Sequence, residues 1–289
     1  MQATDLILVG HLARDEVVVH DVCRERTGGA IYFGAFAAHR SGCACLVATR
    51  LHPEHRDLLR PLEQEGIGVH WTASATTAGN RNIYTTADQD RRVCVLLHAS
   101  EPIDLEHLPP ITPRVFHLGG LIVGQIPDAV IDPLSRRAAV GLDAQGVLRV
   151  DQGGQLRLRP WPDARRLLPL VTYFKADAAE AEVLTGETDL DRAAHALAAL
   201  GPREVVLTHA SSVRVWADER LHVAPLNPRS LQGRTGRGDT CMAAYLAARL
   251  QGHDPAWAGR YAAALTSIKL EQDGPFRGTR EQVLRRMGQ

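Results

Sequence analysis

The feature that most constrains the fold of this chain is the alternation of short apolar runs with longer amphipathic stretches. Short apolar runs bounded by turn residues are typical of buried strands, and apolar residues three or four positions apart are typical of helices. The pattern starts with a strand over residues 5–9, a helix over 30–40 and a strand over 44–49. Repeated strand–helix–strand order predicts an α/β fold with a largely parallel sheet.

The same alternation continues towards the C-terminus. We predict further strands over residues 67–71, 115–118, 139–143, 171–174 and 204–208, with a hairpin over 213–216 and 220–224. We predict further helices over residues 53–65, 127–137, 178–184, 189–200, 239–251, 255–271 and 279–286.

Two β-rich segments interrupt this pattern. Residues 15–22 and 80–97 are extended and β-branched, the second as a hairpin that turns at 88–90, and neither leads into a helix. We predict that they form a small β-lid inserted over the sheet edge, and that residues 1–289 form a single domain. An exposed β-lid also offers a surface for a homodimer.

Composition excludes several kinds of partner. The chain has 33 basic and 33 acidic residues, so no net charge steers it to nucleic acid or to an anionic membrane. No apolar stretch is long enough to span a bilayer, and five cysteines without a regular spacing indicate a reducing cytoplasm. The only lysines are Lys175 and Lys269, and neither lies in a glycine-rich phosphate loop. A phosphate site must therefore use backbone N–H groups and arginine.

The segment that points most clearly to a chemical function is the turn Gly236-Arg237-Gly238-Asp239, which runs into an apolar helix. Two glycines let the backbone approach a ligand closely, and the N–H groups of a first helical turn attract an anion. A carboxylate at the same place can accept a proton from a hydroxyl group. This is the equipment for phosphoryl transfer to an alcohol, although a glycine turn followed by Asp is also a common helix start.

The segment resembles the second signature of the ribokinase/phosphofructokinase-B family, in which Gly-Ala-Gly-Asp forms an anion hole and its Asp is the catalytic base. The first signature is similar to residues 27–42, and Asp15 resembles the family's diol-binding aspartate. Residues 175–186 resemble the Asn-x-x-Glu segment, and 205–208 the strand that leads to the ATP site. The resemblance covers nearly the whole chain and implies a ribokinase-like three-layer α/β/α sandwich.

The resemblance also implies an ATP-dependent, magnesium-dependent kinase with named roles. Asp239 would be the base, and Gly236, Arg237 and Gly238 would form the anion hole. Asp15, Gly28 and Gly29 would bind the acceptor hydroxyl groups. The remaining assignments are Thr208, Thr235 and Lys175 to the nucleotide, and Asp177 and Glu180 to Mg²⁺ through water.

The chain departs from the family pattern at several positions. Gly233 replaces an Asp, which leaves monovalent-cation dependence open, and Arg237 replaces a small residue of the anion hole. Asp177 replaces the Asn of Asn-x-x-Glu, and His209 follows Thr208 where a Gly is usual. The remaining departure is an aromatic pair, Tyr32 and Phe33, near the place of the first-signature Asn.

The segment over residues 140–149 bears on the acceptor. A strand that ends in Asp-x-Gln places polar groups at the carboxyl edge of the sheet, where open α/β folds bind ligands. The segment is similar to the inositol-kinase-like branch of the family, so we add Gln145 to the predicted acceptor site. The favoured acceptor is a cyclitol such as myo-inositol, ahead of other sugars.

Other functions fit the sequence less well. An oxidoreductase would need Gly-x-Gly-x-x-Gly after the first strand, and a P-loop enzyme would need a Gly-Lys pair; the chain has neither. A nucleoside kinase of the same fold remains an alternative. So does a sensor that binds a sugar or nucleotide without catalysis, because the Asn-x-x-Glu segment is altered.

Overall fold

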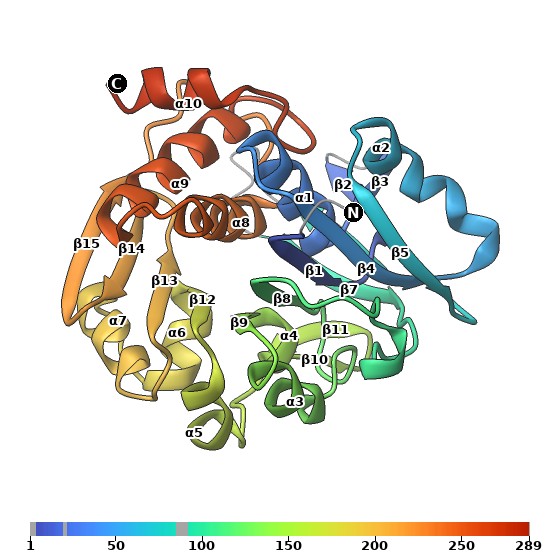
Figure 1. Cartoon of the computed structure of the whole chain (residues 1–289). Helices are drawn as coiled ribbons and strands as arrows, with labels where there is room; N and C mark the ends of the chain where they lie inside the picture. The colour runs from blue at the N-terminus through green and yellow to red at the C-terminus, as the bar shows by residue number, and fades with distance from the viewer. Residues whose placement is uncertain (1–3, 20–21, 85–91, 289) are drawn as a thin grey trace.

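The computed structural model describes residues 4–19, 22–84 and 92–288, which form two β-sheets with helices around the larger one (Figure 1). The larger sheet has the strand order β15-β14-β13-β12-β9-β8-β1-β4-β5. Strands β13 to β5 in that order are parallel, and β14 and β15 are antiparallel to their neighbours. The bounds are β1 Leu6–Gly10, β4 Cys45–Leu51, β5 Gly68–Ala73, β8 Val115–Gly119, β9 Ala139–Asp143, β12 Tyr173–Asp177, β13 Glu204–Thr208, β14 Ser212–Ala217 and β15 Arg220–Pro225.

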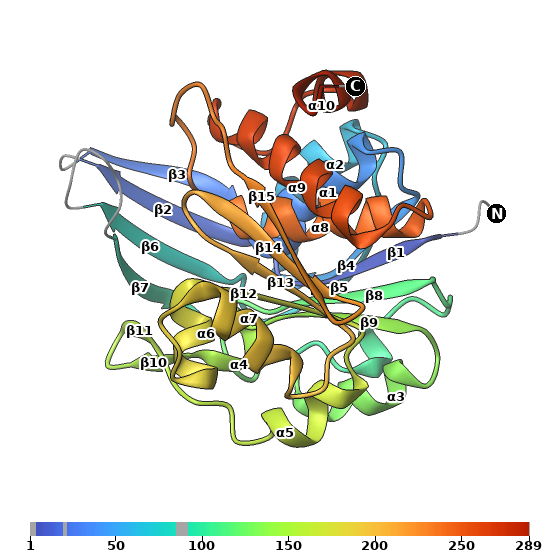
Figure 2. The same ribbon diagram turned by 90° about the vertical axis from the view of Figure 1, so that its left-hand side faces the viewer.

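Helices cover both faces of this sheet, which confirms the predicted three-layer α/β fold (Figure 2). One face carries α1 (Ala30–Arg40), α8 (Arg237–Leu250) and α9 (Pro255–Leu270), with α2 (Arg60–Gln64) and α10 (Arg280–Arg286) on the same side. The other face carries α3 (Ile131–Ser135), α4 (Gln145–Leu148), α5 (Ala164–Leu167), α6 (Ala178–Thr185) and α7 (Leu190–Ala198).

The two faces are built from alternating residues of each strand. In β1, Leu6 and Leu8 belong to the core beneath α1, α8 and α9, whereas Ile7 and Val9 belong to the opposite core. All four side chains are almost completely buried. Continuous apolar strands are typical of a sheet covered on both sides, because neighbouring residues of a strand point to opposite faces and both faces pack against helices.

The second sheet is the lid, with the strand order β10-β11-β7-β6-β2-β3. Its bounds are β2 Ala13–Val19, β3 Val22–Gly28, β6 Gly79–Tyr84, β7 Arg92–His98, β10 Arg149–Gln152 and β11 Gln155–Leu158. The prediction of one extended segment over 15–22 was wrong in detail, since β2 and β3 form an antiparallel hairpin there. The predicted turn at 88–90 lies outside the described residues.

Three other details differ from the prediction. The hairpin of β10 and β11 was not predicted as part of the lid. Residues 53–65 begin as a 3₁₀ segment over Pro53–Leu59, in which His55 leaves helical geometry, before α2. Helix α8 begins at Arg237, two residues earlier than predicted. Across the described ranges, no helix has the length and apolar character needed to cross a membrane.

Candidate active site

The turn before α8 has the geometry expected of an anion-binding helix start. Gly236 is the N-cap residue with φ of 79°, in the left-handed region that favours glycine. No side chain caps this end, so Asp239 is not an N-cap residue and lies inside the first turn, half-buried. Within the described chain the N–H group of Gly238 has no acceptor, as expected for a first-turn amide.

Lys175, the central residue of β12, lies directly beneath this turn. A Cβ atom on Gly238 would be 2.8 Å from Lys175 Nζ, so a side chain at this position would displace the lysine. The ammonium donates a hydrogen bond to Asp143 Oδ1 at 2.9 Å and lies 3.7 Å from Glu180 Oε2. A buried cation therefore lies under the turn over residues 236–239, which we call the anion turn.

Carboxylates keep Lys175 charged. Burial alone would lower the pKa of this lysine, but Asp143, Glu180, Asp239 and Asp177 together raise the pKa above its usual range. A buried ammonium that is paired in this way remains positive at all physiological pH values. A lysine charge therefore lies beneath the turn, where the sequence had led us to expect only backbone N–H groups and arginine.

Asp177 and Glu180, the predicted magnesium residues, form a reciprocal cap at the start of α6. Asp177 Oδ1 accepts from the Glu180 N–H at 2.9 Å, and Glu180 Oε2 accepts from the Asp177 N–H at 2.8 Å. Glu180 is 1% exposed and Asp177 is half-buried. No hydrogen bond from the described part of the chain ends on Asp177 Oδ2, so this oxygen can accept from a magnesium-bound water.

A ready-made metal cage is not present. In the described ranges, no group of three or more His, Cys, Asp or Glu side chains could hold a metal ion.

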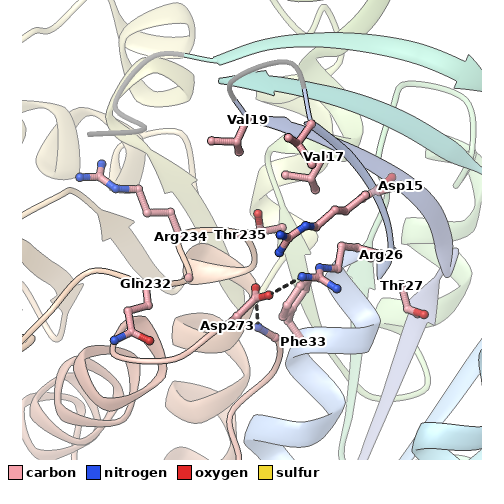
Figure 3. Close-up of a pocket in the computed structure, with 15 residues that line it drawn as sticks. Asp15, Val17, Val19, Arg26, Thr27, Phe33, Gln232, Arg234, Thr235 and Asp273 are labelled. Carbon is pink, nitrogen blue, oxygen red and sulfur yellow. Dashed lines mark hydrogen bonds and ion pairs between the residues drawn. The ribbon is translucent and has the colours of Figure 1, made fainter. Parts of the chain in front are cut away.

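A cavity of about 480 Å³ opens beside the turn, between the lid hairpin β2–β3 and the loop before α8. Figure 3 shows Asp15, Val17 and Val19 along the lid wall, with Phe33 of α1 and Thr235 of the loop among the other lining residues. The remaining lining residues are Val22, Arg24, Arg26, Thr27, Gly28, Gln232, Gly233, Arg234, Asp273 and Gly274. The cavity is large enough for a six-carbon polyol and a phosphate group.

Asp15 is one of two acids that line this cavity, the other being Asp273, and a backbone N–H group helps to fix its position. It is 6% exposed, and its Oδ1 accepts from the Asn80 N–H at 2.9 Å. A Cβ atom on Gly28 would lie 2.1 Å from Asp15 Oδ2, so only glycine leaves room for this carboxylate. Gly29 has φ of 103° at the start of α1, and its missing Cβ would lie 2.3 Å from the His11 carbonyl oxygen.

Two other predicted residues lie at the carboxyl edge of the sheet. Thr208 is buried at the end of β13, and its Oγ1 would be 4.0 Å from a Cβ atom on Gly238. Gln145 starts α4, with Nε2 3.5 Å from the Gly120 carbonyl oxygen, and it does not line the cavity.

The turn that follows β13, the strand predicted to lead to the ATP site, is held to its neighbours by hydrogen bonds. The turn after Thr208 is closed by a hydrogen bond from His209 N–H to the Ser212 carbonyl at 2.9 Å. The segment after β15 is bonded to this turn by Leu226 N–H, 2.8 Å from the Ser211 carbonyl. It is bonded to α9 by the Asn227 N–H, 2.9 Å from Ser267 Oγ.

Three residues with clear places at the site were not predicted. Asp143 pairs with Lys175, Phe33 packs against Gly236, and Lys269 donates to the backbone of the loop before the turn. Asp143 did have a signal, because it ends a buried strand at the ligand-binding edge of the sheet. The other two depend on contacts between distant parts of the chain.

Comparison with known proteins agrees with this geometry. Residues 4–281 match the model of the pfkB family of carbohydrate kinases. A search of curated proteins gives no match. A solved pyrophosphate-dependent kinase of the ribokinase family, complexed with a pyrophosphate analog and myo-inositol, is 31% identical with a TM-score of 0.90 and covers 97% of this chain and 99% of that chain.

Two further structures extend the comparison. One describes the conversion of a pyrophosphate-dependent myo-inositol-1 kinase into a myo-inositol-3 kinase, at 31% identity, TM-score 0.89 and 98% coverage of both chains. The other is ribokinase from Arabidopsis thaliana complexed with ribose and ATP, at 18% identity, TM-score 0.77 and 99% coverage of both chains. The second shows a shared fold.

Proposed function

Because the chain belongs to the pfkB family of carbohydrate kinases and is a phosphotransferase, we propose that it transfers a phosphoryl group from pyrophosphate to a hydroxyl group of a cyclitol such as myo-inositol. The observation that carries this proposal is the similarity, over almost the full length, to pyrophosphate-dependent kinases at 31% and 32% identity. The acceptor is the one favoured from the sequence, and the donor differs from the ATP predicted there.

The hydrogen bonds that hold the segment after β15 support a donor without a base. Hydrogen bonds from Leu226 and Asn227 tie the segment after β15 to the neighbouring turn and to α9. These bonds hold the segment against its neighbours, and pyrophosphate, which has no base, needs only the turn over residues 236–239 and cations. ATP, the donor implied by the family resemblance, is the alternative that the donor assay must exclude.

In the proposed reaction, the transferred phosphoryl group lies against the N–H groups of the turn over 236–239. The positive end of α8 and the Lys175 ammonium stabilise the charge that builds up on its oxygens. Arg237 is the second residue of the same turn and is half-buried. Because phosphoryl transfer requires little covalent chemistry from the protein, positioning and charge provide most of the rate acceleration.

The acceptor side of the reaction uses two carboxylates. Asp15 binds hydroxyl groups of the cyclitol in the cavity, and the missing side chains of Gly28 and Gly29 leave room for the Asp15 carboxylate and for the His11 carbonyl beside it. Asp239 removes the proton from the hydroxyl group that attacks phosphorus, and this contribution is worth about a hundred- to ten-thousand-fold in rate. The proton ends on the Asp239 carboxylate, and phosphate is the leaving group.

Magnesium would be held near Asp177 and Glu180 through water and would neutralise donor phosphate charge. Asp177 Oδ2 is the oxygen with room to accept from such a water. Thr208 lies beside Gly238 and Thr235 lines the cavity just before the turn, so both would contact phosphate oxygens.

The proposal is tested with the purified protein, magnesium and a panel of donors and acceptors. Donors are pyrophosphate and ATP, and acceptors are myo-inositol, other cyclitols, ribose and inosine, with products detected by ³¹P NMR. We expect the highest kcat/KM for pyrophosphate with a cyclitol. Faster turnover with ATP would contradict the donor assignment, faster turnover of inosine would indicate a nucleoside kinase, and binding without turnover would indicate a sensor.

A further inference from the structure

Lys269 is a buried cation whose hydrogen bonds end on the backbone beside the proposed catalytic turn. It lies in the last turn of α9 and is 0% exposed. Its Nζ donates to the carbonyl oxygen of Gly233 at 2.6 Å and also to the carbonyl oxygen of Thr235. The Nζ atom also lies over the face of the Phe33 ring, 5.3 Å from the ring centre, which is a favourable cation–π distance.

The loop that receives these hydrogen bonds lies tightly against the end of α9. The N–H groups of Gln232 and Gly233 donate to the Leu270 carbonyl at 2.9 and 3.2 Å. A Cβ atom on Gly233 would lie 2.2 Å from the Gln272 carbonyl oxygen, so a larger residue at 233 does not fit. Lys269 at the end of α9 therefore brings its positive charge to both carbonyl groups from this side.

This contact is one peptide unit away from the anion turn. Thr235 directly precedes Gly236, and Gly236 in turn packs against the same Phe33 ring that covers Lys269. Any shift of the Thr235 carbonyl rotates the peptide plane that leads into the turn. Lys269, Phe33 and Gly236 thus form one packed unit that fixes the entry to α8.

We propose that the Lys269 ammonium acts as a built-in monovalent cation, which holds the carbonyl groups of residues 233 and 235 and positions the turn of Gly238 and Asp239 for phosphoryl transfer. The proposal rests on the proposed function, in which that turn is the catalytic centre. Two carbonyl oxygens and an aromatic face are ligands that suit either an alkali cation or an ammonium group. With the lysine in this place, turnover needs no added potassium or ammonium ion.

The charged groups around Lys269 set the pH range in which it can act. Burial is the largest influence and lowers the pKa of Lys269 to about 8, while Asp239 of α8 and Asp273 after α9 act in the opposite direction. Asp273 is itself paired with Arg26 of the lid at 2.9 Å. Since the ammonium loses its proton as the pH rises through about 8, the carbonyl groups lose their cation on the alkaline side.

The test compares the wild-type protein with Lys269→Met and Lys269→Arg, using the donor and acceptor that the wild-type protein turns over fastest. Lys269→Met keeps the length of the side chain without its charge. We expect its kcat to fall about a hundredfold, in line with the loss of one charge-stabilising group at an active site. In the shorter variant Lys269→Ala, which leaves space for an ion beside the two carbonyl groups, ammonium or potassium chloride, but not tetramethylammonium chloride, should restore part of the lost activity, and the wild-type protein should respond to none of them.

The pH profile provides a readout that a purely structural lysine would not change. We expect the wild-type kcat to decline above about pH 8 and the decline to move to higher pH in Lys269→Arg, because arginine keeps its charge there. Undiminished kcat in folded Lys269→Met would overturn the proposal. So would equal stimulation of wild-type protein by potassium, which needs no folded variant, or an alkaline limb that Lys269→Arg leaves in place.

Discussion

The ring of Phe33 occupies the space in which a side chain of Gly236 would begin. A Cβ atom on Gly236 would lie 2.1 Å from Phe33 Cγ, and Gly236 also has a positive φ of 79°. The glycine of the turn is therefore required twice, once by backbone conformation and once by packing. The same contact joins α1, which follows the lid hairpin, to α8, which carries Asp239.

Replacing Gly236 with alanine should disrupt the turn. We expect Gly236→Ala to lower kcat at least a hundredfold and to destabilise the protein by more than the roughly 1 kcal/mol typical of alanine at a left-handed position. Gly252→Ala is the matched control, since Gly252 has φ of 88° with open space around it. A double-mutant cycle with Phe33→Ala should recover part of the stability; strict additivity would contradict the contact.

Removing the Lys175 charge should leave buried carboxylates without a partner. We expect Lys175→Met to reduce the free energy of unfolding by about 3–5 kcal/mol, measured by urea denaturation, because Asp143 and Glu180 are then uncompensated. The additional change Asp143→Asn should make this loss smaller. An equal loss in both backgrounds would show that the 2.9 Å contact contributes no coupling energy.

The positions of the strand that ends at Asp143 and of the helix that contains Phe33 could be predicted well from the sequence. The strand of residues 139–143 and the helix of 30–40 have the predicted bounds, because an apolar run and an amphipathic period each end at clear turn residues. The lid was harder. Strands β10 and β11 are four residues each, with mixed polarity around Gly153-Gly154, so their apolar signal is weak.

The site was predictable only where a short motif carries the chemistry. The turn over 236–239 is contiguous in sequence, and the structure places Lys175 beside it. The contacts of Lys269 with Gly233, and of Phe33 with Gly236, join residues far apart along the chain. No local pattern encodes such contacts, because they depend on how α1, α8 and α9 pack on the sheet.

A second buried ion pair should matter for stability and not for turnover. Glu204 at the start of β13 accepts from Tyr245 Oη at 2.5 Å and pairs with Arg249 at 2.7 Å, at the opposite end of the strand from Thr208. We expect Glu204→Ala to lower the free energy of unfolding by about 3 kcal/mol and to leave kcat within about twofold. A large loss of kcat in the folded variant would mean that this end of the sheet also influences catalysis.

Acid should destabilise the protein through His117. Burial lowers the pKa of this histidine to about 4, and neither ring nitrogen has a hydrogen-bond partner among the described residues. Because the folded-state pKa lies below the unfolded value of about 6.5, the unfolded state binds more protons between these values. The stabilisation is therefore complete above about pH 6.5 and is lost as the pH falls towards 4, by at most about 3 kcal/mol.

His117→Leu should remove this part of the acid sensitivity, as measured by urea denaturation at pH 7 and pH 4.5. His98→Leu, on an exposed position of the lid, is the control and should leave the pH dependence as in the wild type. Identical pH dependence in all three proteins would show that His117 does not titrate in this range.

Asp239 is proposed as the base of a kinase whose anion site is the turn before α8, and a rapid-quench experiment measures this role on the chemical step itself. Wild-type protein and Asp239→Asn are each mixed with magnesium, pyrophosphate and saturating myo-inositol, and formation of inositol phosphate is followed over a single turnover. We expect inositol phosphate to form about a hundred- to ten-thousand-fold more slowly in Asp239→Asn than in the wild-type protein, with pyrophosphate binding retained. Formation of product by Asp239→Asn at the wild-type rate would contradict it.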